Sequence, residues 1–217
     1  IRSAFIAPPG WKFLSADYSQ VELRILAHFS QDQALLSAFA NNEDVHSATA
    51  ARIHGILPSQ VNDAQRREAK AVNFGLIYGM GAHGLAKQLN VSKEQAQQLI
   101  SAYFDVYPGV KQYLDSVREG VQVDGYVKTV LGRKLWMPQA KSSGMEKQAA
   151  LRAAVNAPMQ GSASDMIKLA MISITENIKQ MGMESKLVLQ IHDELLFEFP
   201  VHEQDTLLKL VIDKMEN

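Results

Sequence analysis

Two aspartates lie in short apolar segments that are far apart in the sequence. Asp17 ends the run WKFLSAD, and Asp193 lies within the run KLVLQIHDELLFEF. A carboxylate among apolar residues costs free energy to desolvate unless a cation or a hydrogen-bond donor pairs with it. If both runs are strands of one sheet, the carboxylates can meet at its edge and hold Mg²⁺, which also binds phosphate oxygens. Two such ions can stabilise both oxygens of a phosphoryl displacement; turn-favouring acids that bind no metal are the alternative.

A second group of residues shares one face of a predicted helix. Arg66, Lys70, Phe74 and Tyr78 are each four residues apart, and steps of four keep side chains on one helix face. Two cations followed by two rings suit a nucleoside triphosphate, because cations pair with phosphates and rings stack on the sugar and base. Arg66 and Lys70 also lie in the N-terminal half, where the helix dipole favours anions. The alternative is an amphipathic helix with both rings in the core.

A third group, Arg152, Asn156 and Gln160, has the same spacing, with Pro158 between the last two. Amides on one helix face can bind the acceptors that every base pair shows in the minor groove, which checks pairing without reading sequence. A polar helix surface is the alternative.

Charge is concentrated locally. The chain has 22 basic and 23 acidic residues, so its net charge is −1, unlike that of many nucleic-acid binders. Between residues 128 and 152, six basic residues face one acid, Glu146, which gives +5. The basic residues are Lys128, Arg133, Lys134, Lys141, Lys147 and Arg152. This segment is either a nucleic-acid contact or a solvated loop.

Two histidines have two interpretations each, and one acid has a simple electrostatic one. His192 could orient the neighbouring aspartate or contact a primer end, or it could be a turn histidine with no special role. His46 could help bind phosphate, or it could be a surface histidine after the acidic pair Glu43 and Asp44. Glu22 lies in the first turn of a predicted helix, where the helix dipole alone favours an acid.

The elements that must position these residues follow from apolar spacing. Asn62 or Asp63 is the predicted N-cap of the helix that carries Arg66, and Ser92 with Gln95 forms a capping-box pattern. The first half of the chain is predicted to contain a strand at 11–17, a helix at 21–29, helical segments in 32–54, and helices at 64–78, 92–106 and 108–123.

The second half of the chain adds a smaller set of elements. It is predicted to contain a hairpin or loop at 125–138, a helix at 144–180 broken near Pro158, strands within 186–199, and a helix from about Glu203. The order of strand, helices, hairpin and helix predicts an α+β fold, a small antiparallel sheet carrying a helical insertion.

Composition limits the class of protein. With 47% apolar residues, the 217-residue chain can form one large domain or two small ones. The absence of cysteine excludes disulfides and thiolate metal sites and suits a reducing compartment. No apolar run reaches about 18 residues, so no membrane span is expected. No signal peptide opens the chain. The first residue is Ile1 rather than Met, so we expect the chain to be part of a longer protein.

Three motifs resemble those of the family A (bacterial DNA polymerase I-like) DNA polymerases. Residues 17–24, DYSQVELR, resemble motif A; residues 66–79, RREAKAVNFGLIYG, resemble motif B; and residues 190–194, QIHDE, resemble motif C. RAAVNAPMQGSASD at 152–165 and YPGV at 107–110 fit as well. The resemblance covers nearly the whole chain in the right order.

The resemblance implies roles for these residues. Asp17 and Asp193 would bind two Mg²⁺ ions, with the Tyr18 carbonyl as a further ligand, Mn²⁺ as a substitute, and Glu194 in a lesser catalytic role. Lys70 would also protonate the leaving pyrophosphate. The implied nucleotide-binding residues are Arg66, Lys70, Phe74, Tyr78, His46 and Glu22, the last as a steric gate against a 2′-hydroxyl. The implied DNA-binding residues are Arg152, Asn156, Gln160, His192 and Arg133.

The implied activity is template-directed DNA synthesis from dNTPs on a primer–template by a monomer in the cytoplasm of a bacterium or phage-infected cell. Residues 1–30 and 144–217 would form the palm and 31–143 the fingers, with a thumb and an exonuclease-like domain upstream. The alternatives are a single-subunit RNA polymerase, against which Glu22 argues, a metal-dependent phosphohydrolase, and a non-enzymatic DNA-binding module. Because the chain is nearly neutral, we expect it to be weakly active or inactive alone.

Overall fold

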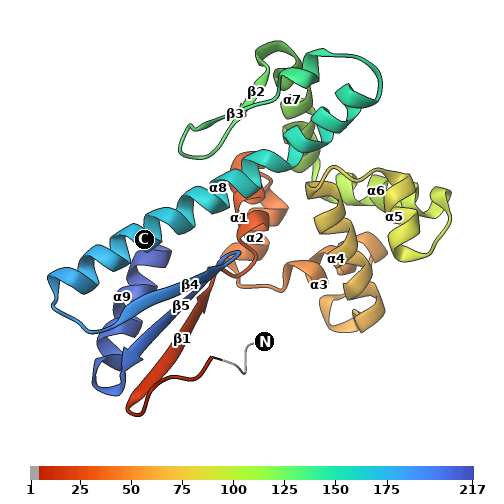
Figure 1. Cartoon of the computed structure of the whole chain (residues 1–217). Coiled ribbons are helices and arrows are strands. Elements are labelled where there is room, and N and C mark those ends of the chain that lie inside the picture. Colours follow the sequence, from red (N-terminus) through yellow and green to blue (C-terminus); the bar gives the residue numbers. More distant parts are fainter. Residues whose placement is uncertain (1–4) are drawn as a thin grey trace. The chain divides into compact units, whose positions relative to one another are not determined.

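The structure, a computed structural model, describes residues 5–217, which divide into two compact units (Figure 1). Unit 1 joins the two ends of the chain, the residues up to Val21 and Ala163–Asn217. Unit 2 is Glu22–Ser162. The division expected from the sequence lay after residues 30 and 143 instead.

Unit 1 contains a three-stranded antiparallel sheet and two helices. The strands lie in the order β1, β5, β4, so the first strand of the chain pairs with the last. The elements are β1 (Trp11–Asp17), β4 (Lys186–Ile191), β5 (Glu194–Pro200), the C-terminal part of α8 (Gly144–Gln180) and α9 (Gln204–Glu216), with a short 3-10 turn at Val201–Glu203.

The core of unit 1 lies on one face of this sheet. Side chains alternate along β5, so Leu195, Phe197 and Phe199 are buried while Glu194 and Glu198 are only half-buried. The buried side chains pack with residues of both helices, namely Ile167, Ile174, Ile178, Leu207 and Val211. The helices therefore cover one face, and the acids of β5 lie on the other.

Unit 2 is mainly helical. Its elements are α1 (Val21–Ser30), α2 (Gln33–Ala40), α3 (Val45–His54), α4 (Asp63–Ile77), α5 (Ala82–Leu89), α6 (Lys93–Val106), α7 (Pro108–Asp124), the hairpin β2 (Tyr126–Lys128) and β3 (Lys134–Trp136), 3-10 turns at Pro58–Gln60 and Pro138–Lys141, and the first part of α8. The α+β fold class predicted from the sequence is confirmed.

The predicted helix starts are also confirmed. Asn62 caps α4 by accepting from the Gln65 amide at 2.9 Å, and the Gln65 side chain accepts from the Asn62 amide at 3.0 Å. Ser92 and Gln95 form the same reciprocal pair at α6, with distances of 2.9 and 3.1 Å. Such a box satisfies two amides that a helix leaves without intrahelical partners.

Two details differ from the sequence-based expectation. The predicted break near Pro158 is wrong, because α8 runs unbroken through it for 37 residues. Proline removes one backbone hydrogen bond, but Val155 and Met159 beside it are buried and hold the helix in place. Helix α5 was not predicted; it is only eight residues long and contains Gly84, which is a poor helix former.

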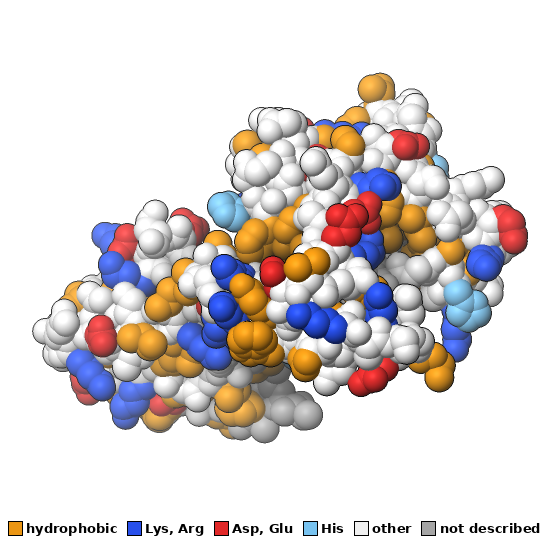
Figure 2. All heavy atoms as spheres, turned by 90° about the horizontal axis from the view of Figure 1, so that it is seen from above, with side chains coloured by type: hydrophobic (Ala, Val, Ile, Leu, Met, Phe, Trp, Pro, Cys, Tyr) orange, Lys and Arg blue, Asp and Glu red, His pale blue; other side chains and the backbone are white. Residues whose placement is uncertain are grey.

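The surface carries both signs of charge. On the face that Figure 2 shows, Lys and Arg side chains are interspersed with Asp and Glu side chains, with apolar side chains exposed among them. None of the helices within residues 5–217 combines the length and apolar character that crossing a bilayer requires.

Candidate functional site

The predicted carboxylates come together at one end of the unit 1 sheet. Asp17 is the register partner of Glu194 across β1 and β5. Asp193 directly precedes Glu194, because His192 and Asp193 form the turn between the paired residues Ile191 and Glu194. Beyond the strand end, the Tyr18 amide donates to the Asp193 carbonyl at 3.4 Å. Pairing of two distant segments thus brings three acids to one edge.

The strand pleat leaves this edge open to solvent. Leu14 and Ala16 pack against the core, so Ser15 and Asp17 lie on the other face, and both are exposed. The expectation that apolar neighbours desolvate Asp17 is therefore wrong. Ser15 Oγ donates to Glu194 Oε1 at 2.5 Å, a contact that fixes one carboxylate and that motif spacing could not reveal.

The donor set at this edge fits a hard divalent cation. Carboxylates and a backbone carbonyl are the oxygens that Mg²⁺ prefers, with solvent access for its remaining waters. Tyr18 would contribute only its carbonyl, because its ring packs against the core and burial raises the pKa of its hydroxyl. The candidate ligands for such a cation are therefore Asp17, Asp193 and the Tyr18 carbonyl, with Glu194 adjacent.

Another acidic group in unit 1 has a structural role. Ligand atoms of Glu184, His202 and Glu203 lie within 4.8 Å of one another. The Glu203 carboxylate, however, already accepts from the Glu184 amide, the Ser185 amide and Ser185 Oγ at 2.8, 3.0 and 2.5 Å. Burial works to raise the pKa of Glu203, but these hydrogen bonds outweigh it and lower that pKa. The group closes the turn before β4.

In unit 2, α4 presents the predicted row of cations and rings. Lys70 is exposed, Arg66 and Phe74 are half-buried, and Tyr78 is 44% exposed. The rings of Phe74 and Tyr78 stack with their centroids 6.2 Å apart. The alternative that both rings belong to the core is therefore wrong. The buried residues of α4 lie elsewhere on the helix and are Ala69, Val72, Asn73, Gly75, Leu76 and Ile77.

Arg66 is held by an acid that the sequence analysis did not connect with it. Its Nε and a terminal nitrogen donate to the two carboxylate oxygens of Asp44 at 3.1 and 2.7 Å. Asp44 also caps α3 by accepting from the Ser47 amide at 2.7 Å. The Arg66 hydrogen bond holds the pKa of Asp44 well below its usual range. The guanidinium is thus oriented bidentately by a carboxylate, the geometry that also suits a phosphate.

His46 is a buried neighbour of Phe74, one of the residues in this row. It is only 3% exposed, so the alternative of a surface histidine is wrong. Its ring centroid is 5.5 Å from that of Phe74, and its Nδ1 is 3.1 Å from Asn73 Nδ2. Burial, together with the charges of Arg66 and Lys70, lowers the pKa of His46 against the opposing effect of Asp44. An amide donor at Nδ1 places the imidazole proton on Nε2.

Buried polar residues fasten α4 to its neighbours. Asn73 is fully buried, and its Nδ2 donates to Thr49 Oγ1 of α3 at 3.2 Å. Thr49 Oγ1 lies 2.9 Å from the Tyr107 hydroxyl, which in turn accepts from Arg52 at 3.4 Å. This network was not predicted from the sequence; the signal available there was an asparagine among apolar helix residues.

The backbone at Gly79, just after α4, lies close to the backbone of Arg152 in α8. A Cβ on Gly79 would lie 3.0 Å from backbone atoms of Arg152, and its φ is +70°. At Gly75, within α4, the nearest neighbours of such a Cβ would lie at 3.5 Å or more, an ordinary contact. The end of α4 therefore packs on the backbone of α8 where the third predicted group begins.

That third group shares one face of α8. Arg152 and Gln160 are exposed and Asn156 is half-buried, with its Oδ1 lacking a hydrogen-bond partner within residues 5–217. Nearby, Arg133 donates to the Gly161 carbonyl at 3.2 Å. These four side chains lie in unit 2.

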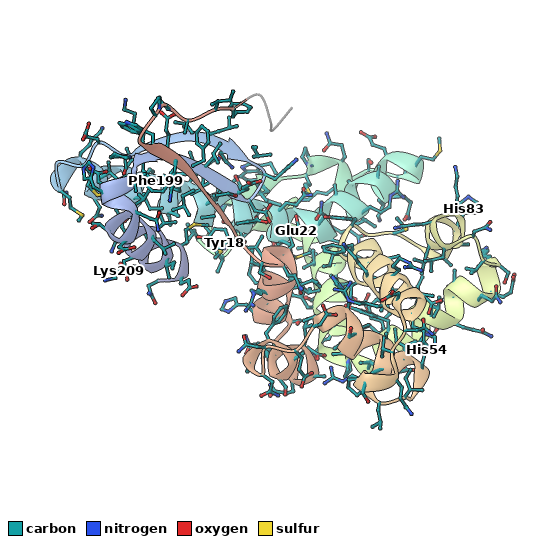
Figure 3. The ribbon with its side chains drawn as sticks, turned by 90° about the horizontal axis from the view of Figure 1, so that it is seen from below. Tyr18, Glu22, His54, His83, Phe199 and Lys209 are labelled. Atoms are coloured by element: carbon teal, nitrogen blue, oxygen red, sulfur yellow. The ribbon has the colours of Figure 1, made fainter. Side chains whose placement is uncertain are left out.

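The two remaining predicted residues lie at element ends. His192 is exposed in the β4–β5 turn with φ at +56°, and Gln190 donates to its carbonyl at 2.8 Å. Glu22 is half-buried in the first turn of α1, four residues after Tyr18 (Figure 3).

Comparisons with known proteins agree with this arrangement. DNA polymerase I of Chloroflexus aurantiacus is 45% identical over 217 residues, which is 100% of this chain and 23% of that protein. DNA polymerase I of Pseudomonas aeruginosa is 49% identical over 199 residues, 91% of this chain and 22% of the relative. The chain thus spans about a quarter of the length of these relatives.

A solved structure supports the same relationship. The POL domain of Pol1 from M. smegmatis, in complex with DNA primer-template and dNTP, matches with a TM-score of 0.95 and 46% identity. The match covers 99% of this chain and 38% of that one. The sequence also matches the profile of DNA polymerase family A over residues 1–217. With the predicted motif residues gathered at a sheet edge and on one helix face, the chain belongs to DNA polymerase family A.

Proposed function

We propose that this chain carries the nucleotidyl-transfer part of a DNA polymerase, which adds dNTPs to a primer 3′-hydroxyl under the direction of a template. The observation that carries the proposal is the meeting of Asp17, Asp193 and Glu194 at one sheet edge. The solved relative in complex with primer-template and dNTP supports the substrate class.

Asp17, Asp193 and the Tyr18 carbonyl would hold two Mg²⁺ ions, or Mn²⁺ in their place, and Glu194 would keep its carboxylate beside them through Ser15. Bound Mg²⁺ lowers the pKa of a coordinated hydroxyl and neutralises charge on the phosphates. The primer 3′-hydroxyl would pass its proton to a solvent water at this open edge, and its oxygen would form a bond to the α-phosphorus. The bond from that phosphorus to the bridging oxygen breaks, and pyrophosphate leaves.

The face of α4 would bind the triphosphate. Arg66 would exchange its bidentate pair with Asp44 for phosphate oxygens of the same geometry. Lys70, which is exposed, would contact the phosphates and donate a proton to the departing pyrophosphate. His46, neutral and protonated at Nε2, would donate a hydrogen bond rather than a charge. Pre-oriented donors of this kind stabilise the charge that develops in the transition state.

The rings and Glu22 would select the sugar and base. Phe74 would pack on the sugar, and Tyr78 would stack near the templating base, a role that its 44% exposure permits. Glu22 would occupy the space that a 2′-hydroxyl needs, which favours deoxynucleotides.

The remaining candidate residues would bind DNA. Arg152, Asn156 and Gln160 present one face of α8 to the duplex, and Arg133 adds a cation held against the same helix. His192 would contact the primer end. Unit 1 would then be the palm and unit 2 the fingers with their connections, acting as a monomer with upstream domains of the parent protein.

Primer extension tests this proposal. The chain would be joined to the C-terminal end of the residues that precede this region in a related polymerase, such as that of Pseudomonas aeruginosa. We call the product the fusion protein and would supply it with primer–template, dNTPs and Mg²⁺. We expect templated extension that Asp193→Asn abolishes. A folded fusion protein that binds primer–template but does not extend it would refute the proposal.

The products separate the alternatives. Extension with rNTPs at the dNTP rate would indicate an RNA polymerase. Release of nucleotides without a longer primer would indicate a phosphohydrolase. Binding that is unaffected by Asp193→Asn, with no reaction, would indicate a DNA-binding module.

A further inference from the structure

The β2–β3 hairpin of unit 2 has one face made only of aromatic and basic side chains. Its pairing places Tyr126 opposite Trp136 and Lys128 opposite Lys134. Residues two apart on a strand, and residues directly opposite each other, share a face of the sheet. These four side chains are therefore neighbours, and we call them the hairpin face.

The rings and cations of the hairpin face lie close together. The ring centroids of Tyr126 and Trp136 are 5.1 Å apart at an interplanar angle of 62°. Lys134 Nζ lies 4.5 Å from the Tyr126 centroid and 5.6 Å from that of Trp136, and Lys128 Nζ lies 5.8 Å from Tyr126. Trp136 is nevertheless 67% exposed, so the flat surface of a large ring remains available beside two positive charges.

Two features of this arrangement are unfavourable for the free protein. Like charges directly opposite each other on a sheet repel, and neither lysine forms an ion pair with an acid within residues 5–217. An exposed tryptophan also forgoes the free energy that its burial would release. Both costs disappear if a ligand supplies negative charge and a flat apolar surface.

Contacts on the opposite face of the hairpin and in its loop hold it rigidly. Val127 and Leu135, on the opposite face, pack in a core cluster with Val121, Ala140 and Ala154. The connecting loop is fixed to α8 by hydrogen bonds from the Val130 amide to Ser162 Oγ at 2.9 Å and from Arg133 to the Gly161 carbonyl at 3.2 Å.

Gly161 makes this contact tight. A Cβ at that position would meet Thr129 Cγ2 at 2.8 Å and Leu135 Cδ1 at 2.9 Å. Ligand binding therefore need not order the hairpin, which avoids an entropic cost of association.

We propose that the hairpin face binds single-stranded nucleic acid, with a base stacked on Trp136 and the adjoining phosphates paired with Lys128 and Lys134. Unpaired bases expose the π-faces that aromatic side chains bind, whereas bases inside a duplex do not. Under the proposed function, the bound strand is the unpaired part of the template. Only this identification of the strand rests on the proposed function. The basic segment 128–152 thus acquires a specific site at its start.

Fluorescence of the chain's two tryptophans, Trp11 and Trp136, tests the site directly. Trp11→Phe leaves Trp136 as the emitter, and Trp136→Phe leaves Trp11, which lies in unit 1. In low salt without dNTP or Mg²⁺, oligo(dT) should quench the emission of the first variant and not that of the second. Equal quenching in both variants, or none in the first, would overturn the inference.

The lysines are tested in the Trp11→Phe background. Each phosphate contact on a single strand contributes about 0.7 to the steepness with which log affinity falls against log salt. The double variant Lys128→Gln, Lys134→Gln should therefore reduce this steepness by about 1.4. Lys209→Gln on α9, an exposed lysine labelled in Figure 3, is the matched control and should leave the slope unchanged. Equal slopes in the double variant and the control would contradict the proposed phosphate contacts.

Two further outcomes are decisive. Trp136→Leu, checked for folding by circular dichroism, should weaken oligo(dT) binding about tenfold, the loss expected for one stacked base. Quenching by an acidic peptide or by blunt duplex as strong as that by oligo(dT) would mean that the face binds anions or proteins generally. Normal primer extension without oligo(dT) binding at Trp136 would refute this inference alone. Oligo(dT) binding at Trp136 without primer extension would refute only the proposed function.

Discussion

At the scale of single residues, Asp44 occupies the Arg66 guanidinium that an anion on α4 would otherwise bind. The guanidinium is oriented by two hydrogen bonds but is not buried, since the Arg66 and Asp44 side chains are 43% and 37% exposed. A pair this exposed contributes less than about 1 kcal/mol to stability, so its main effect is on competition with ligand.

Asp44→Asn tests that competition. Asparagine retains an N-cap acceptor for α3 but loses the charge that competes for Arg66. We expect the fusion protein to bind the incoming dNTP several-fold more tightly, with the free energy of unfolding changed by less than about 1 kcal/mol. Weaker dNTP binding would mean that Asp44 holds Arg66 in its binding position, contrary to the competition argued here.

His46 predicts a pH dependence of stability. Its pKa in the folded state lies below 6.5, its ordinary value. Below about pH 6.5 the unfolded chain binds a proton that the folded chain does not, so stability falls as pH drops toward the folded pKa. His46→Gln should remove a slope of up to about 1.4 kcal/mol per pH unit from denaturant unfolding below pH 6.5. Parallel curves for the two proteins would contradict this.

Sequence spacing identified these residues better than their partners. Steps of four found Arg66, Lys70, Phe74 and Tyr78 because helix geometry alone puts them on one face. Asp44 lies 22 residues from Arg66, and the hydrogen bond from Ser15 to Glu194 joins residues 179 apart. Such pairs depend on tertiary packing, which local patterns do not encode.

At the scale of elements, Gly79 defines how α4 ends against α8. A comparison with Gly55 separates backbone conformation from close approach. Both glycines have positive φ, +70° and +64°, but only Gly79 has atoms within 4 Å of a built Cβ. Gly55→Ala should cost about 1–2 kcal/mol, the cost of a left-handed non-glycine residue.

Gly79→Ala should cost at least about 1 kcal/mol more than Gly55→Ala, because it also forces the Arg152 backbone away. Denaturant unfolding of both variants measures the difference. Equal losses would show that the contact of α4 with α8 relaxes without cost, which would contradict the tight packing described here.

Element boundaries were predictable where a local signal exists. The capping boxes at Asn62 and Ser92 fixed two helix starts. Helix α5 escaped detection because it has only eight residues, one of which is Gly84. Pro158 was expected to break α8, but burial of its neighbours outweighed the loss of one hydrogen bond.

At the scale of the whole molecule, the mixed surface charge limits what this chain does alone. Phosphate contacts dominate affinity for DNA, and the chain has a net charge of −1 and about a quarter of the length of its relatives. We expect the isolated chain to extend a primer far more slowly than the fusion protein, with the difference widening as salt is raised. Equal rates at moderate salt would contradict this.

The fold class followed from the order of strand, helices and hairpin, but the topology did not. The sequence indicated that β4 and β5 form a hairpin around Asp193. That β1 pairs with β5 rather than β4 is a long-range choice, and it is this choice that puts Asp17 opposite Glu194. The residues of the candidate site could therefore be predicted from the sequence, whereas their geometry could not.

The most direct test of the account is single-turnover incorporation by the fusion protein at varied dNTP concentration. If the sheet edge performs the chemistry and α4 binds the triphosphate, Asp193→Asn should lower the maximal rate about a hundredfold or more with little change in dNTP affinity. Arg66→Ala should weaken dNTP affinity about tenfold or more. An Asp193→Asn protein that retains its maximal rate would contradict the central claim.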